Sequence, residues 1–133
     1  MTKNEKLAAV IEKYKQHPQF LGTEIRDPNQ RGPLDDTLLH LAARRGAVDD
    51  IEVLVAAGAN INAAGDLGYT PLHRAAMVGK LDAVKKLVDL GADPRIENEL
   101  GETPSKVAEL GGHEEIVALL QRYRPKPRKT GEK

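Results

Sequence analysis

The feature that most constrains this chain is an internal repeat with a period of 33 residues. The segment Thr37–Ala43 returns as Thr70–Ala76 and, in a weaker form, as Thr103–Glu109. A fixed period of this length predicts supersecondary units that stack, because each unit alone cannot bury its apolar face. The repeat therefore argues against a single globular core and favours binding over chemistry. Three glycines keep the same phase: Gly46, Gly79 and Gly112.

Each repeat carries the signals of two short helices. In the first complete repeat, residues 32–64, Thr37 can cap a helix through its hydroxyl and Gly46 can end it. A second helix is expected from Val48 to Ala57, where the apolar side chains cluster. The same signals recur over residues 65–97 and, as a C-terminal capping repeat, over residues 98–123.

Residues 4–31 read as a degenerate first repeat that caps the stack. A helix is expected over residues 5–16, where apolar residues recur at helical spacing. Pro18 falls where the second helix of this unit should run, so a second helix within residues 17–31 is left open. We expect one repeat domain over residues 1–123. The spaced apolar residues are Leu7, Val10, Ile11 and Tyr14.

The C-terminal residues differ in composition from the rest of the chain. Residues 122–133 hold six Lys or Arg and one Glu, whereas residues 1–121 hold 14 Lys or Arg and 19 Asp or Glu. Because residues 124–133 offer little apolar surface to bury, we expect a disordered basic tail. The tail is either a solubilising end or an electrostatic anchor for an acidic partner or nucleic acid. The acidic body argues against nucleic-acid binding by the repeats themselves.

The repeat resembles that of the ankyrin family. The resemblance rests on Thr-Pro-Leu-His-Arg-Ala-Ala at residues 70–76, the glycine that follows, an apolar second helix, and Gly-Ala-Asn or Gly-Ala-Asp at residues 58–60 and 91–93. It implies an all-α solenoid of helix–turn–helix units with β-hairpin loops, about three good repeats and the N-terminal cap. Asp35 stands where the later repeats have glycine, so we expect a less regular entry to the first repeat.

Residues that could support catalysis are few. The chain has no Cys, and Ser105 is its only Ser. His40 and His73 hold the same repeat position, and the resemblance implies that they order the loops by binding the backbone. His113 has no second His one turn along its helix, as a zinc-binding helix would require. We therefore expect no enzyme activity, no catalytic or metal-binding residues, no cofactor and no small-molecule substrate.

The resemblance implies that a partner protein meets the concave face, which consists of the hairpin tips and the exposed side of each repeat's first helix. Tyr69 and Met77 are the strongest candidates, because exposed aromatic and Met side chains are typical of protein-binding patches. Leu67, Leu100 and Leu110 could contribute or could pack between neighbouring repeats. The full set of candidates is Leu34, Asp36, Arg44, Arg45, Asp66, Leu67, Tyr69, Met77, Val78, Glu99, Leu100, Glu102 and Leu110.

Three functions fit these observations. The first is a non-catalytic protein-binding module, expected to be a cytoplasmic monomer, since no secretory signal or membrane-spanning run is present in the sequence. The second is a dedicated inhibitor or immunity-type protein that blocks one enzyme or toxin through the same face. The third is association with nucleic acid through the basic tail. The identity of the partner does not follow from the sequence.

Overall fold

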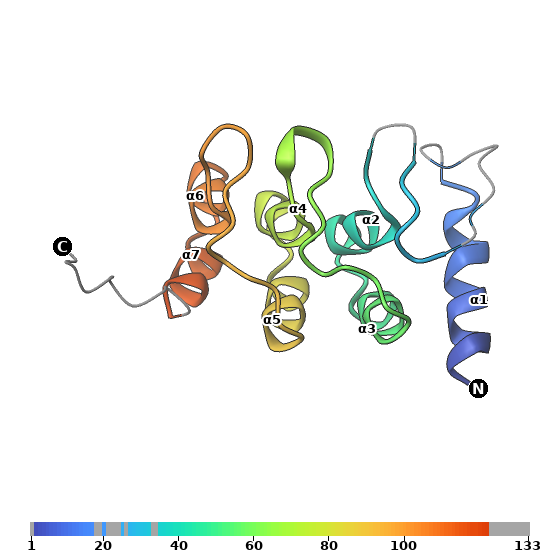
Figure 1. Ribbon diagram of the computed structural model, residues 1–133. Helices are drawn as coiled ribbons and strands as arrows, with labels where there is room; N and C mark the ends of the chain where they lie inside the picture. Colours follow the sequence, from blue (N-terminus) through green and yellow to red (C-terminus); the bar gives the residue numbers. More distant parts are fainter. Residues whose placement is uncertain (1, 18–19, 21–24, 26, 33–34, 123–133) are drawn as a thin grey trace, which may run out of the picture.

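The computed structural model describes residues 2–17, 20, 25, 27–32 and 35–122. Helices α2, α4 and α6 form one row, and α3, α5 and α7 form a second row beside it (Figure 1). None of the described helices is long and apolar enough to cross a lipid bilayer. The α-helices are α1 (Lys3–Tyr14), α2 (Leu38–Arg45), α3 (Val48–Ala56), α4 (Pro71–Val78), α5 (Leu81–Asp89), α6 (Pro104–Leu110) and α7 (Glu114–Gln121), with a short 3-10 turn, η1 (Asp66–Gly68).

The first helix of each repeat begins and ends where its sequence signals predict. The Thr37 hydroxyl accepts a hydrogen bond from the backbone N–H of His40 at the start of α2. At the other end, Gly46 adopts a left-handed conformation, with φ 73°, that a side chain would strain. Thr70 and Gly79 do the same for α4. The predicted α2 bounds are confirmed, and α3 ends one residue earlier than expected.

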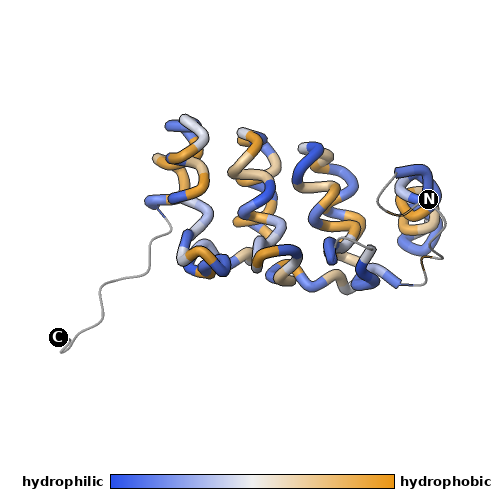
Figure 2. The backbone as a smooth tube through the Cα atoms, turned by 90° about the horizontal axis from the view of Figure 1, so that it is seen from above, coloured by the Kyte–Doolittle hydropathy of each residue, from blue (hydrophilic) through white to orange (hydrophobic). Residues whose placement is uncertain are grey.

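The core is a continuous layer of small and branched apolar side chains between the repeats. Alanines in α2 and α4 are fully buried, so neighbouring first helices can approach closely. Figure 2 shows apolar and hydrophilic stretches alternating along the helices, as expected for elements buried on one side. The largest fully buried side chains include Leu38, Leu39, Leu41, Ile51, Leu54, Leu72, Leu87, Ile116 and Leu120.

Tight turns, rather than extended strands, form the hairpin loops within the described residues. In the second repeat the N–H of Gly65 donates to the Tyr69 carbonyl at 2.8 Å. The first repeat closes its turn in the same way, from Gly32 to Asp36. Asp35 adopts φ 68°, close to the 76° of the glycine in the next repeat, so its backbone accepts a conformation that suits glycine. The expectation of an irregular entry is therefore wrong for the part of this turn that the structure describes.

Asparagine side chains tie each turn to the next repeat. The Asn29 Oδ1 accepts a hydrogen bond from the Asn60 N–H at 2.6 Å. One repeat later, the Asn62 Oδ1 accepts from the Asp93 N–H at 2.9 Å. Asn29 thus plays the part of Asn62 one period earlier, and the segment around it belongs to the stacked backbone.

Helix α1 closes the N-terminal end of the stack. It begins at Lys3, earlier than the expected residue 5, and ends at Tyr14. In the 33-residue register α1 corresponds to a first helix, but it packs chiefly against α3, in the row of second helices. A second helix within residues 17–31 falls partly outside the described residues, and the described part is not helical. The predicted tail, residues 124–133, lies outside the described residues altogether.

A buried polar cluster fixes α1 to α3. Tyr14 is fully buried, and its hydroxyl donates a hydrogen bond to Asp50 Oδ2 at 2.9 Å. The ammonium of Lys13 forms an ion pair with the same carboxylate at 2.8 Å. The guanidinium of Arg45 lies 5.2 Å from the centre of the tyrosine ring. Burial and the neighbouring Asp50 raise the pKa of the Tyr14 hydroxyl, so it remains a proton donor throughout the physiological range.

We predict that Tyr14→Phe lowers the free energy of unfolding by about 1 kcal/mol, because it removes one hydrogen bond to a buried carboxylate and leaves the ring in place. Urea unfolding followed by circular dichroism measures the change. Glu12→Gln is the matched control, since it removes only an exposed charge in the same helix. Equal midpoints for Tyr14→Phe and the control would show that the cluster does not hold α1.

Candidate protein-binding surface

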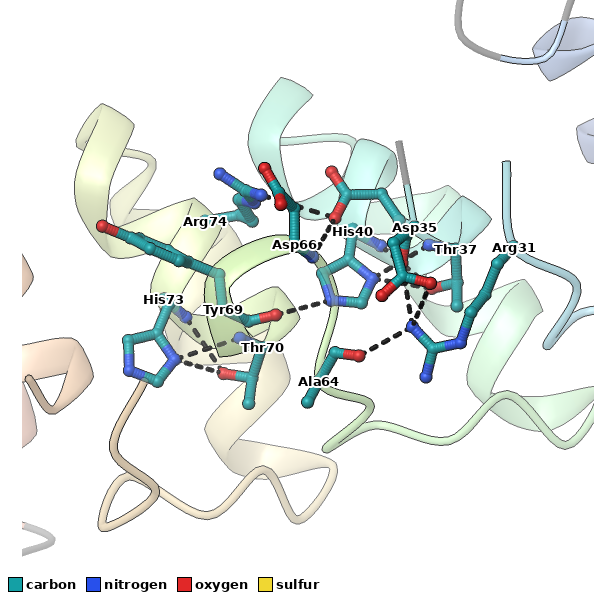
Figure 3. Close-up of polar contacts among 11 residues, drawn as sticks. Arg31, Asp35, Thr37, His40, Ala64, Asp66, Tyr69, Thr70, His73 and Arg74 are labelled. Atoms are coloured by element: carbon teal, nitrogen blue, oxygen red, sulfur yellow. Dashed lines mark hydrogen bonds and ion pairs between the residues drawn. The ribbon is translucent and has the colours of Figure 1, made fainter. Parts of the chain in front are cut away.

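Two histidines connect each first helix to the hairpin turn of the following repeat. His40 Nε2 donates to the Tyr69 carbonyl at 2.8 Å, and His73 Nε2 donates to the Glu102 carbonyl at 2.8 Å. On the other side of its ring, His40 Nδ1 accepts from the backbone N–H of Thr37 at 3.0 Å. Figure 3 shows His40 between Thr37 and the Tyr69 carbonyl, and His73 against Thr70. The predicted structural role of these histidines agrees with these contacts.

The partners of each ring define its protonation state. A backbone N–H can only donate and a carbonyl can only accept, so Nδ1 carries no proton and Nε2 carries one. A second proton at Nδ1 would face the N–H of the capping threonine. Burial lowers the pKa of His40 and of His73 below the ordinary value of 6.5. Both rings are therefore neutral hydrogen-bonding bridges in the folded protein.

Arg74 is a residue whose role the sequence analysis missed. It stands in α4 at the repeat position that Leu41 and Val107 fill with buried apolar side chains. Its side chain is 14% exposed, and its Nη2 lies 3.4 Å from Asp36 Oδ1 in the preceding repeat. Its guanidinium also lies 4.6 Å from the centre of the Tyr69 ring. The sequence does indicate a special role, since Arg74 is a charged residue at a repeat position where the neighbouring repeats have Leu41 and Val107.

The contacts of Arg74 change the interpretation of two predicted binding residues. Asp36 is 3% exposed and paired with Arg74, so its expected place on the accessible face is wrong. The Tyr69 ring is half-buried, edge-on to His73 and against Arg74, so it does not simply face solvent as expected. Substitutions at Tyr69 must therefore affect folding as well as any binding.

Gly65 makes room for this polar cluster. A Cβ at residue 65 would lie 2.4 Å from Asp36 Oδ1 and 2.9 Å from His40 Nε2. The backbone here does not need glycine for its dihedral angles, since its φ is −99°. The glycine instead lets the turn approach the carboxylate, whose Oδ1 accepts a long hydrogen bond from the Asp66 N–H at 3.4 Å.

Three leucines of the predicted concave face are open to solvent. Leu67 is 51% exposed, Leu100 is 65% exposed and Leu110 is 64% exposed. The alternative that they pack between neighbouring repeats is therefore wrong. Leu67 also holds a positive φ of 55°, which a branched side chain adopts at a steric cost. Large apolar side chains in such positions are typical of a surface that another molecule covers.

Four of the exposed apolar residues form two strips at opposite ends of α4 and α6, whereas Leu90 is exposed at the end of α5. At the hairpin tips, the Leu67 carbonyl accepts from the Glu99 N–H at 2.9 Å, so the tips carrying Leu67 and Leu100 are joined. At the helix ends, Val78 is 38% exposed beside the half-buried Met77, and Leu110 lies in the next repeat. Helices of this length separate the strips by about 12 Å. We call the five residues of the two strips together the apolar patch.

The remaining candidates surround the apolar patch with charge. Arg44 and Arg45 are exposed at the end of α2, although Arg45 also covers the Tyr14 ring. Asp66 and Glu99 are exposed at the hairpin tips, while Glu102 is half-buried and accepts a hydrogen bond from Asn98. Leu34 lies outside the described residues.

Among the residues that the structure describes, no group of three His, Asp or Glu side chains could hold a metal ion. An open groove between α1 and α3 is lined by the exposed Lys3, Lys6, Asp49 and Glu52 together with Val53 and Ala56, and Glu52 also forms an ion pair with Lys86. His113 Nε2 donates to the Met77 carbonyl at 3.1 Å, which explains this histidine by packing between repeats. The described geometry thus favours a surface over a catalytic cleft.

Comparison with known proteins agrees with the architecture. A family model described as ankyrin repeats, in three copies, matches residues 7–98. The chain therefore belongs to the ankyrin-repeat family. No curated protein matches the chain. Ankyrin repeats generally serve as protein–protein interaction modules, and the family is typically non-catalytic. The match includes α1, whereas the repeat formed by α6 and α7 lies beyond it.

We predict that the protein loses stability as the pH falls. The unfolded chain binds protons at His40 and His73 near pH 6.5, but the folded protein binds them only at lower pH, because their pKa is lowered. The free energy of unfolding is therefore fully present above about pH 6.5 and declines toward pH 5. Urea midpoints measured across this range test the slope. The free energy of unfolding of the double variant His40→Gln/His73→Gln should be about 1 kcal/mol or more lower than that of the wild type at neutral pH. It should also decrease less as the pH falls, and an unchanged pH dependence would contradict the assignment.

We predict that Arg74→Ala lowers the free energy of unfolding by about 2 kcal/mol, because it leaves Asp36 buried without its cation. Arg74→Leu combined with Asp36→Asn should recover most of this loss, since an apolar residue fills the same repeat position in the neighbouring units. Urea unfolding of Arg74→Leu, of Asp36→Asn and of the double variant measures the coupling between the two side chains. Strictly additive effects would show that the two side chains do not interact.

Proposed function

We propose that this protein is a non-catalytic binding module that holds a partner protein on its concave face, with the apolar patch as the main contact. The observation that carries the proposal is the exposure of three leucines on adjacent repeats. Interface energy concentrates on a few apolar and aromatic side chains surrounded by polar ones, and this face has that composition. The general role of ankyrin repeats supports the same conclusion.

The arrangement also favours a preformed site. Both strips are held by elements whose backbones are bonded across the repeats, through His73 to Glu102 and from Glu99 to Leu67. A rigid surface loses little conformational freedom on binding, which leaves more of the contact energy as affinity. We propose that the half-buried Tyr69 adds to the contact next to the tip strip, with Arg44 and Arg45 at one margin of the surface.

An adaptor and a dedicated inhibitor would use the same surface, so the partner itself distinguishes them. If the captured partner is an enzyme or toxin whose activity stops on binding, the chain is an inhibitor. If its activity continues, the chain is an adaptor.

We predict that Leu100→Asp/Leu110→Asp abolishes capture of the partner without unfolding the protein, since both side chains are exposed. The loss should be about 2 kcal/mol or more, near thirtyfold in affinity. Purified full-length protein and the variant are compared in affinity capture read by mass spectrometry, followed by calorimetry with the partner. The control is Lys85→Ala/Asp89→Ala, which changes exposed residues of α5. A partner lost by the control and kept by the leucine variant would place the interface elsewhere.

A further inference from the structure

The exposed leucines share a local pattern that the binding role alone does not explain. Each leucine of the apolar patch follows an acidic residue, in the pairs Asp66-Leu67, Glu99-Leu100 and Glu109-Leu110. All three acidic residues are exposed. Leu90, exposed at the end of α5, follows Asp89 in the same way. The apolar patch is therefore accompanied by a carboxylate at every solvent-exposed leucine.

These carboxylates have little local compensation. Among the described residues, Asp66 and Glu99 take part in no ion pair, and Glu109 has only the exposed Lys106 at 3.6 Å. Arg74 does not supply the missing charge, because it is mostly buried and its cation is directed at Asp36. The hairpin tips thus present negative charge beside exposed apolar surface.

The opposite corner of the face has the reverse charge. Arg44 and Arg45, both exposed, occupy in α2 the positions that Met77 and Val78 hold in α4. The two arginines lie one repeat before the apolar helix ends, and the acidic tips lie at the other end of the first helices. The predicted binding face therefore carries exposed arginines at the helix end of the first repeat, and apolar side chains accompanied by carboxylates in the two repeats that follow. Such a pattern fits a partner in one orientation only, because reversing it would bring like charges together.

We propose that the partner is a protein segment that places apolar side chains on the apolar patch and Lys or Arg side chains against Asp66, Glu99 and Glu109. This inference rests on the proposed function and adds the chemical class of the partner. The attraction has two physical parts. Burial of the leucines supplies most of the affinity, and the carboxylates accelerate association and select basic partners. Binding should therefore weaken as salt is added.

The test uses the full-length protein as bait for a library of random peptides displayed on phage. Peptides enriched on the wild type should combine Leu, Ile, Phe, Met or Trp with Lys or Arg. Their synthetic versions are then titrated against three variants. Asp66→Lys/Glu99→Lys reverses the charge at the tips, Leu67→Ser/Leu100→Ser removes the apolar contact, and Asp89→Lys/Glu115→Lys makes the same charge change on the second helices, as a control.

We expect the charge reversal at the tips to weaken peptide binding about tenfold or more at low salt, and the serine variant to weaken it at least as much. The control variant should bind like the wild type. Urea midpoints establish that each variant is folded, which is expected because all the altered side chains are exposed. High salt should remove most of the difference between the wild type and the charge-reversed variant.

Two results would overturn the inference, and they are distinguishable. Peptides that need the leucines but bind the charge-reversed variant as well as the wild type would refute the basic partner and leave the proposed function standing. Peptides that bind both tip variants like the wild type, or a library that yields no enrichment over the serine variant, would refute the proposed function together with the inference.

Discussion

The structure depends on one repeated interaction, in which a neutral imidazole joins the start of its own helix to the turn of the next repeat. His40 and His73 each accept from a capping threonine and donate to a carbonyl 29 residues further along the chain. A single ring thereby fixes the helix start, the position of the following hairpin tip and the spacing between units. Because Leu67 and Leu100 sit on those tips, and Met77 and Val78 lie on the helix that His73 begins, much of the geometry of the candidate surface follows from these bridges.

Much of the fold could be predicted from the sequence, because the repeat places the same physical signal at the same phase three times. Thr37 and Gly46 predict both ends of α2, and their equivalents predict α4. The position of α1 could not be predicted in this way. Its residues have the phase of a first helix, but the buried pair Tyr14 and Asp50 holds it against α3. That contact joins residues 36 positions apart and leaves no periodic trace.

The candidate surface was less predictable than the fold, for a physical reason. The repeat does not constrain which residues stand at the hairpin tips and helix ends. The type of residue at such a position therefore does not indicate whether its side chain is exposed to solvent. Leu67 and Leu100 proved open, while Asp36 and Tyr69 were drawn inward by Arg74. Arg74, a largely buried cation at a repeat position that is otherwise apolar, contacts both of these residues, which belong to two different repeats. Pairwise contacts of this kind depend on the folded geometry, whereas the helix caps depend only on local sequence.

The histidine bridge is missing from the last repeat, where Lys106 occupies the position of His40 and His73. Within the described residues the two ends of the stack differ: α1 is fixed to α3 by a buried tyrosine and carboxylate, whereas the last repeat is bonded to the preceding one through His73 and His113. In a linear array, opening starts where a unit has a single neighbour. Helices α6 and α7 are thus where local opening is expected to start, and two of the five residues of the apolar patch, Leu100 and Leu110, lie on this unit. A ligand that contacts both Leu67 and Leu100 would hold the last repeat against the preceding one. Binding would then raise the free energy needed to open the last repeat, by an amount set by the concentration and affinity of the ligand.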